Sequence, residues 1–314
     1  MNLAPIVLFV YNRPLHTKRT LEALQLNRHI EKSTLYVFCD GPKEHSTSEE
    51  LDAIKEVRAI VSRIDFCQEL IISEEKSNHG LANSVMQGVS KVVKQHGKVI
   101  VLEDDIVTGI GFLEFMNSAI NYYENDQTVF GVSGYKYPTQ KKIKQSSYLL
   151  PIASSWSYGT WKGAWNRINF DGQMLLDKIN KENKSQEMNF GGNRFYEMLC
   201  EQVKGNIDSW AIRFYASMFL EKGLFIFPKI SLVQNIGFDN SGTHCKEDDF
   251  FSEVHVSDQV ITVSEGLTLQ EDIVAVFKKS FQQNNKPTQK KSNKLKKGLI
   301  RLMKSIRLKS PILC

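Results

Sequence analysis

The chain has 314 residues, of which 41% are hydrophobic, and a formal net charge of +5. This composition is typical of a globular protein with one large core or two fused halves, and it excludes a disordered chain. The five cysteines are scattered without a Cys-x-x-Cys pair, which favours reduced thiols and a cytoplasmic location. We expect neither a membrane-spanning helix nor a secretory signal, because no apolar run is long enough and the first residues lack a basic region.

The first part of the chain alternates between apolar strands and amphipathic helices. The strands and helices expected there, in chain order, are 5–10, 15–26, 35–39, 46–61, 70–72 and 81–93. Ser46 and Glu49 have the spacing of a capping box at the start of the second helix. Parallel neighbours need crossover connections, so this alternation predicts a parallel, Rossmann-like sheet.

A fourth strand at 98–102 leads directly into three consecutive carboxylates, Glu103, Asp104 and Asp105. In open α/β sheets, ligands bind outside the carboxyl ends of the strands, so we expect the triplet at a pocket. Adjacent carboxylates repel one another unless a cation compensates, and oxygen ligands suit Mg²⁺ or Mn²⁺. The triplet therefore indicates a site for a divalent metal and a nucleoside diphosphate. The alternative is a solvated acidic loop between a strand and a helix.

Two common nucleotide-binding fingerprints are absent. The first strand is not followed by Gly-x-Gly-x-x-Gly, and no Gly-x-x-x-x-Gly-Lys-Ser/Thr occurs. These absences argue against a dinucleotide-dependent oxidoreductase and against a P-loop enzyme.

The alternation ends after a helix at 112–123 and a strand at 129–134. An aromatic stretch that begins at Pro151 contains three of the four tryptophans. Their rings could stack on sugars or bases, or pack in the core. Residues 170–193 are expected to form a polar, mobile connection.

Two polar residues in the second half are candidates for chemistry. Asp208 precedes a segment with helical spacing, where it could be a helix N-cap or a catalytic carboxylate. His244 lies in a polar loop that contains glycine, where it could reach a metal or a phosphate, or be a structural histidine.

These features occur in the order seen in GT-A glycosyltransferases, and the stretch from Pro5 to His244 resembles the bacterial sugar transferases related to N-acetylglucosaminyltransferase I. The motifs that carry the resemblance are Tyr11-Asn12-Arg13, Cys39-Asp40-Gly41, Glu103-Asp104-Asp105 and Ile207-Asp208-Ser209-Trp210. The resemblance implies an α/β, GT-A (Rossmann-like), mostly parallel sheet flanked by helices. It implies a glycosyltransferase domain at 1–277, with a nucleotide-sugar-binding half at 1–134 and an acceptor-binding half at 135–277.

The resemblance also implies roles for the residues of the first half. Arg13 and Asp40 would hold the uracil of UDP. Asp105 would ligate Mn²⁺ or Mg²⁺, while Glu103 and Asp104 would face the donor sugar and the ribose.

Further roles follow from the same resemblance. Either Asn83 or Ser84 would contact the ribose, and His244 would be a second metal ligand. Asp208 would be the catalytic base. Ile207 and Ser209 replace a tryptophan and an acid of the family motif, so contacts to the acceptor are expected to differ.

The implied reaction is a metal-dependent, inverting transfer of a hexose or N-acetylhexosamine. The donor would be a nucleotide sugar, most simply a UDP-sugar, and the acceptor a glycan or lipid-linked glycan in bacterial surface polysaccharide synthesis. Two alternatives stay open. A nucleotidyltransferase shares the sheet and the metal-binding acids but needs a basic Gly-rich loop after the first strand, and a non-enzymatic adaptor would bind a membrane or nucleic acid.

A basic tail is expected at 278–314. Its segment 294–309 places leucines on one helical face and lysines and arginines mostly elsewhere, so it could lie in an anionic membrane surface. This predicts a peripheral protein on the inner face of the cell membrane, with no nucleic-acid partner. The alternative is a solvated, disordered tail.

Overall fold

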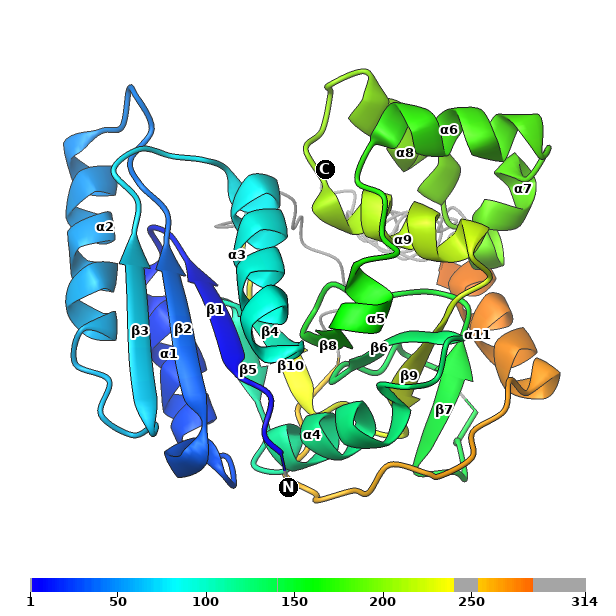
Figure 1. Cartoon of the computed structure of the whole chain (residues 1–314), viewed down its shortest axis with the longest axis horizontal. Coiled ribbons are helices and arrows are strands. Elements are labelled where there is room, and N and C mark those ends of the chain that lie inside the picture. Colours follow the sequence, from blue (N-terminus) through cyan, green and yellow to red (C-terminus); the bar gives the residue numbers. More distant parts are fainter. Residues whose placement is uncertain (1, 140, 240–253, 285–314) are drawn as a thin grey trace, which may run out of the picture.

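The computed structural model describes residues 2–139, 141–239 and 254–284 (Figure 1). The expectations for His244 and for the segment 294–309 therefore lie outside the described residues. Within these ranges, no helix combines the length and the apolar character that a membrane crossing requires.

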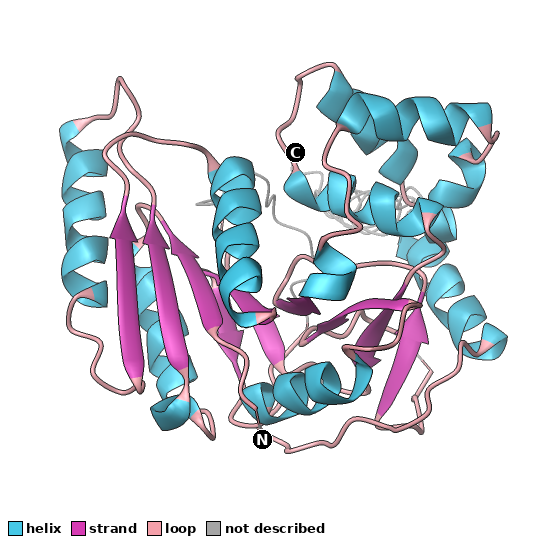
Figure 2. Ribbon diagram, viewed as in Figure 1, coloured by secondary structure: helices cyan, strands magenta, loops and turns pink. Residues whose placement is uncertain are grey.

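One eight-stranded sheet forms the centre of the molecule (Figure 2). In spatial order its strands are β3 (Glu69–Glu74), β2 (Thr34–Cys39), β1 (Ile6–Val10), β4 (Lys98–Glu103), β8 (Tyr158–Trp161), β6 (Val129–Ser133), β9 (Leu224–Pro228) and β7 (Ser147–Leu150). The strands from β3 to β4 are parallel neighbours, β8 is antiparallel to β4 and β6, and β7 is antiparallel to β9. The predicted α/β class, with a mostly parallel sheet flanked by helices, is confirmed.

Helices cover this sheet, and a small second sheet lies beside it (Figure 1). The helices are α1 (Pro14–Gln25), α2 (Ser48–Val61), α3 (Leu81–His96), α4 (Phe112–Tyr123), α5 (Lys162–Trp165), α6 (Gly172–Lys181), α7 (Ser185–Met188), α8 (Phe195–Val203), α9 (Trp210–Leu220) and α11 (Glu271–Asn284). The second sheet pairs β5 (Ile106–Thr108) with β10 (Val233–Asn235) in antiparallel fashion. Because β5 follows the acidic triplet, this pair brings the segment after β10 close to the end of β4.

The central strands have no solvent-facing side. Every residue of β1 is buried, and the same holds for β4 up to Leu102. Continuous apolar runs of this kind are typical of a parallel strand that helices cover on both faces. The polar residues that follow each run are therefore left at the edge of the core.

Two helix predictions need correction. The capping box of α2 is one residue later than expected, with Thr47 and Glu50 as its reciprocal partners, because both pairs have the same spacing and the helix starts at Ser48. The stretch 170–193 is not a polar connection. It contains α6, α7 and a 3-10 turn at Phe190–Gly192, and these bury Leu175, Ile179 and Met188.

The tryptophans at 161 and 165 belong to different elements. Trp161 ends β8, and Trp165 ends the short helix α5, so the two do not share a helix face. Both side chains are buried, and the indole of Trp165 donates to Ser90 Oγ at 2.9 Å. Of the two roles considered, core packing is the one observed for these residues.

The expected boundary between body and tail, at 277/278, falls inside α11. This helix buries Phe277 and Phe281 together, and Ser280 Oγ donates to the carbonyl of Pro138 at 2.7 Å. The spacing of apolar residues therefore continues past the expected boundary, and α11 packs with the body up to Phe281.

Candidate functional site

A cleft of about 320 Å³ opens at the carboxyl ends of β1, β2 and β4, and we call it the main cleft. The parallel register explains its position, because Val10 pairs with Cys39 and Phe9 pairs with Glu103. The connections after these strands therefore meet at one edge of the sheet. The sequence-predicted residues that line the cleft are Arg13, Asp40, Ser84, Glu103, Asp104, Asp105 and Asp208.

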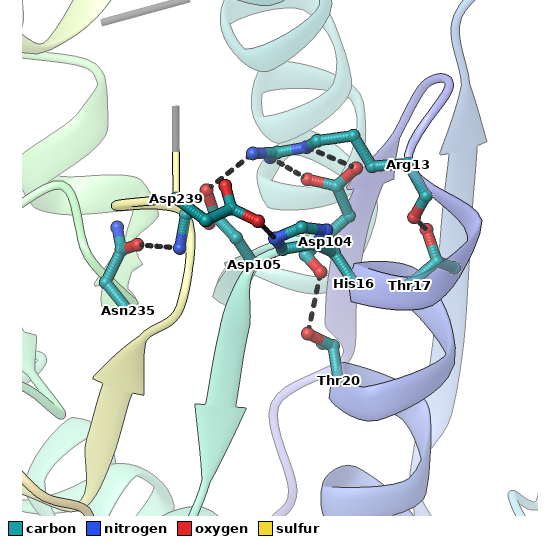
Figure 3. Close-up of polar contacts among 9 residues, drawn as sticks. Arg13, His16, Thr17, Thr20, Asp104, Asp105, Asn235 and Asp239 are labelled. Carbon is teal, nitrogen blue, oxygen red and sulfur yellow. Dashed lines mark hydrogen bonds and ion pairs between the residues drawn. The ribbon is translucent and has the colours of Figure 1, made fainter. Parts of the chain in front are cut away.

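Arg13 is the electrostatic partner of the acidic triplet (Figure 3). Its Nε donates to Asp104 Oδ2 at 3.2 Å, its Nη2 pairs with Asp104 Oδ1, and its Nη1 lies 3.0 Å from Asp105 Oδ2. Burial opposes the guanidinium charge, but the two aspartates outweigh it and raise the pKa of Arg13 above its ordinary value. The guanidinium therefore remains charged and neutralises part of the triplet.

The first turns of α1 hold this arrangement in place. Pro14 opens the helix directly after Arg13, and Thr17 Oγ1 donates to the Arg13 carbonyl at 2.9 Å. Thr20, one turn further along, donates from Oγ1 to the Asp104 carbonyl at 2.8 Å (Figure 3). Both ends of the ion pair are thus anchored to one helix.

Burial makes protonation of the triplet easier than in solution. It raises the pKa of Glu103 to about 8, with the charges of Asp105 and Asp104 acting in the same direction. Burial also raises the pKa of Asp104 to about 6, and Arg13 limits that shift. The charged forms of these two acids are therefore destabilised by burial, which is the condition under which a further cation is stabilising.

Asp105 has one carboxylate oxygen without a partner. Within the described part of the chain, Asp105 Oδ1 is buried and makes no hydrogen bond. Gly237 lies against the same carboxylate so closely that a Cβ at this position would collide with Oδ2. The Gly237 N–H donates to Asn235 Oδ1 at 2.7 Å, which fixes the glycine at the end of β10. A buried orphan oxygen is costly unless a ligand, water or cation satisfies it.

The Asp40 carboxylate accepts four hydrogen bonds, three of them from backbone N–H groups. Its Oδ1 accepts from the N–H groups of Gly41 and His79, each at 2.9 Å. Its Oδ2 accepts from Asn78 Nδ2 at 3.0 Å and from the Gly80 N–H at 3.1 Å. The carboxylate therefore joins the end of β2 to the loop that starts α3.

The structure separates the two residues considered for ribose contact. Ser84 lines the main cleft, whereas Asn83 is exposed and donates from Nδ2 to the His79 carbonyl at 3.1 Å. Only Ser84 is thus placed to meet a ligand in this cleft.

Asp208 comes from the second half of the chain but lines the same cleft. Its side chain is 58% exposed, and Arg213 Nη2 donates to its Oδ1 at 3.2 Å. Its Oδ2 faces Gly80 at the start of α3, since a Cβ there would lie 3.9 Å away. Asp208 is not the N-cap of α9. Ser209 takes that place, and its Oγ accepts from the Ile212 N–H at 3.3 Å.

The described residues contain no preformed cage of three or more metal-ligating side chains. One further pair borders the triplet, where His16 Nε2 lies 3.2 Å from Asp239 Oδ2 (Figure 3). Asp105 Oδ1 is the oxygen of the two aspartates that Arg13 leaves for a cation.

Several residues of the site were not predicted from the sequence. Lys43 and Asn78 line the main cleft, Thr20 holds the triplet, and Gly237 borders Asp105. Asn78 and Gly237 reach the site through loops that are distant in sequence from the motifs. Of these four residues, Lys43 could have been inferred from the sequence, because it closely follows the predicted site residue Asp40.

Comparison with known proteins gives one family match and remote structural similarities. The family described as Nucleotidyl transferase matches residues 4–140. No curated protein matches the chain. Among solved structures, S. aureus TarS has 14% identity and a TM-score of 0.32, over 63% of this chain and 33% of that one. The galactosyltransferase LgtC, in complex with donor and acceptor sugar analogs, has 10% identity and a TM-score of 0.37, over 68% and 70%. The chain thus spans about a third of the length of TarS.

Proposed function

We propose that this chain is a glycosyltransferase that moves a hexose or N-acetylhexosamine from a nucleotide sugar, in the first instance a UDP-sugar, to a glycan acceptor. The observation that carries the proposal is that Asp208 lines the same cleft as Arg13 and the acidic triplet. Glycosyl transfer needs positive charge for the departing diphosphate and a carboxylate for the attacking hydroxyl. A cation held by the triplet would supply the positive charge, and Asp208 would supply the carboxylate.

The donor would lie along the ends of β1, β2 and β4. The cleft volume, about 320 Å³, is within the range of small-molecule sites. Arg13 and Asp40 would contact the base, with Asp40 acting mainly through the loop it holds, because both its oxygens already accept hydrogen bonds. Ser84 would contact the ribose, and Glu103 and Asp104 would face the donor sugar and the ribose.

The residues present fit a divalent cation held by few protein ligands. Asp105 Oδ1 is free to bind Mn²⁺ or Mg²⁺, whereas Arg13 already pairs with the other aspartate oxygens. Sites of this kind are completed by substrate phosphate oxygens and water. When bound, the cation would stabilise negative charge on the departing diphosphate.

Asp208 is the proposed base. Its exposed carboxylate is accessible to an acceptor hydroxyl, and its ion pair with Arg213 orients the side chain. As the acceptor oxygen attacks the anomeric carbon, its proton would pass to Asp208, and direct displacement would invert the configuration at that carbon.

A nucleotidyltransferase is the second candidate, because the family of that description matches residues 4–140. Such an enzyme would need a basic, Gly-rich loop after the first strand. Here β1 ends at Val10 and α1 starts at Pro14, so the connection is the glycine-free stretch 11–13. This geometry favours the glycosyltransferase.

A single pair of assays separates the candidates. The full chain with Mn²⁺ is incubated either with a panel of UDP- and other nucleotide sugars, or with nucleoside triphosphates and sugar 1-phosphates. We expect nucleoside diphosphate release from a nucleotide sugar, with the affinity for that donor raised by Mn²⁺. Pyrophosphate release from the triphosphate mixtures would establish the nucleotidyltransferase instead, and no turnover in either assay would reject both.

A location on the inner membrane face, with a lipid-linked acceptor in surface polysaccharide synthesis, is a further part of the proposal and rests on the sequence of 294–309. Deletion of residues 286–314 should abolish co-sedimentation with anionic vesicles while nucleotide-sugar hydrolysis continues. Loss of hydrolysis together with vesicle binding would contradict this division of roles.

A further inference from the structure

A second cavity of about 150 Å³ lies next to the main cleft, between β8, α8 and the start of α9. We call it the aromatic cavity, because Tyr158, Phe195, Trp210 and Phe214 form much of its wall. At about 30 Å³ for each water molecule, it has room for roughly five waters. That size suits one small ring and is too small for a nucleotide.

The wall of the aromatic cavity is uncharged. Among the described residues that line it, the polar ones are tyrosines and serines, and none is acidic or basic. The main cleft, in contrast, is lined by Arg13, Lys43 and several carboxylates. An occupant with a formal charge would lose its hydration without gaining a partner, so the cavity favours a neutral group.

One buried polar atom in this wall lacks a partner. The side chain of Tyr158 is buried, and its hydroxyl makes no hydrogen bond within the described part of the chain. Burial, together with the charge of Glu103, raises its pKa well above the ordinary value, so the hydroxyl stays protonated. An unpaired buried hydroxyl is destabilising, and a ligand oxygen would satisfy it.

The aromatic cavity adjoins the proposed base. Asp208 lines the main cleft, and the next residues, Ser209 and Trp210, line the aromatic cavity. The rings of Trp210 and Tyr158 lie 5.1 Å apart, so the start of α9 contacts β8 through these two side chains. The main cleft and the aromatic cavity are therefore lined by consecutive residues at the start of α9.

We propose that the aromatic cavity binds a neutral monosaccharide unit of the acceptor. Aromatic walls with a few polar groups suit a sugar ring, which has apolar C–H faces and hydroxyl edges. The Tyr158 hydroxyl bonds one of those hydroxyls, and the ring presents another to Asp208. The inference rests on the proposed glycosyltransferase function and adds to it the chemical class of the acceptor.

Binding without donor tests the cavity separately from the reaction. Ligand-observed NMR on the full chain uses methyl glycosides of neutral hexoses and N-acetylhexosamines, methyl glucuronide as the charged counterpart, and 1-octanol as an alkyl probe. We expect at least one neutral glycoside to bind, at least tenfold more tightly than the glucuronide. Binding of octanol alone would assign the cavity to a lipid chain, and equal or stronger binding of the glucuronide would also overturn the proposal.

Two variants locate the binding. Ser155→Trp fills the cavity from its rim and should abolish glycoside binding, whereas Ser155→Ala should not. Tyr158→Phe should weaken binding about tenfold while the melting temperature stays the same or rises, because the orphan hydroxyl is removed. Unchanged glycoside binding in both Ser155→Trp and Tyr158→Phe would place the sugar elsewhere and overturn the proposal. UDP binding is measured in parallel and should remain within twofold in all three variants. Absence of UDP binding in the unmodified chain would contradict the proposed glycosyltransferase function. It would not contradict sugar binding in the aromatic cavity.

Discussion

Arg13 Nη1 lies 3.0 Å from Asp105 Oδ2, so a protein cation already pairs with the carboxylate proposed to hold the metal. The same guanidinium pairs with Asp104. Arg13 therefore offsets part of the charge of the triplet, and a bound cation must share Asp105 with it. This shared position links the stability of the fold to occupancy of the site.

Replacement of Arg13 tests that link. Arg13→Ala would leave adjacent buried carboxylates without their counter-charge, so the free energy of unfolding should fall by about 3 kcal/mol without divalent ions. Urea titrations with EDTA or with Mn²⁺ provide the measurement. Mn²⁺ should stabilise the variant more than the unmodified chain, because Arg13 no longer competes for Asp105. Arg19→Ala, an exposed change on the same helix, is the control and should shift neither titration by more than about 0.5 kcal/mol.

Asp40 is expected to stabilise the fold, because its carboxylate holds the loop before α3. Asp40→Asn replaces an acceptor of four hydrogen bonds by a group that must direct an NH₂ toward at least one donor. We expect a loss of about 2–4 kcal/mol in urea unfolding, since bonds to a charged acceptor are worth about 1.5–3 kcal/mol each. The exposed change Asp52→Asn should stay within about 0.5 kcal/mol. Equal stability of the two variants would show that the loop does not depend on Asp40.

Asp105→Ala removes the orphan oxygen together with the rest of the carboxylate. Mn²⁺-dependent UDP binding should disappear in calorimetric titration, and sugar transfer should fall by several orders of magnitude. Binding of UDP without metal should change by no more than a few fold, because the proposed contacts to the uracil and the ribose remain. Tight Mn²⁺-dependent binding by the variant would remove Asp105 from the site.

Asp208→Asn should separate chemistry from donor binding. An amide cannot accept the acceptor proton, so transfer should fall by several orders of magnitude while the UDP affinity stays within about threefold. Asp171→Asn, at the N-cap of α6 outside the cleft, is a matched control that should keep full transfer. An active Asp208→Asn variant would mean that another group is the base.

The parts of the fold that were predicted correctly have strong local signals. The alternation of apolar runs and helical periods defined β1 to β4 and the helices between them, and the carboxyl-end rule placed the triplet at a pocket. The sequence could not show which side chains form ion pairs with one another. Nothing in the local pattern indicates that Arg13 pairs with the triplet, because that contact joins residues 91 positions apart.

The errors have local causes as well. The helices in 170–193 were not predicted because they are short and bury few apolar residues. Asp208 and its neighbour Ser209 are both suitable N-cap residues, so the sequence alone did not decide between them. The aromatic cavity draws residues from β8, α8 and α9, so no stretch of sequence contains it. The sequence thus indicated residues for the base and the metal but not the proposed acceptor site.

Glu103 predicts how stability should depend on pH. Burial raises its folded-state pKa from 4.5 to about 8, so between these values the folded chain keeps a proton that the unfolded chain releases. Stability therefore falls as the pH rises through this window, since it decreases wherever the folded state binds more protons. In Glu103→Gln the side chain at this position does not titrate. The free energy of unfolding of the variant minus that of the unmodified chain should therefore increase by on the order of 2 kcal/mol from pH 5 to pH 8. Urea unfolding in EDTA measures the difference, and the exposed change Glu56→Gln should follow the unmodified chain. Parallel pH profiles for Glu103→Gln and the unmodified chain would show that burial does not hold a proton on Glu103.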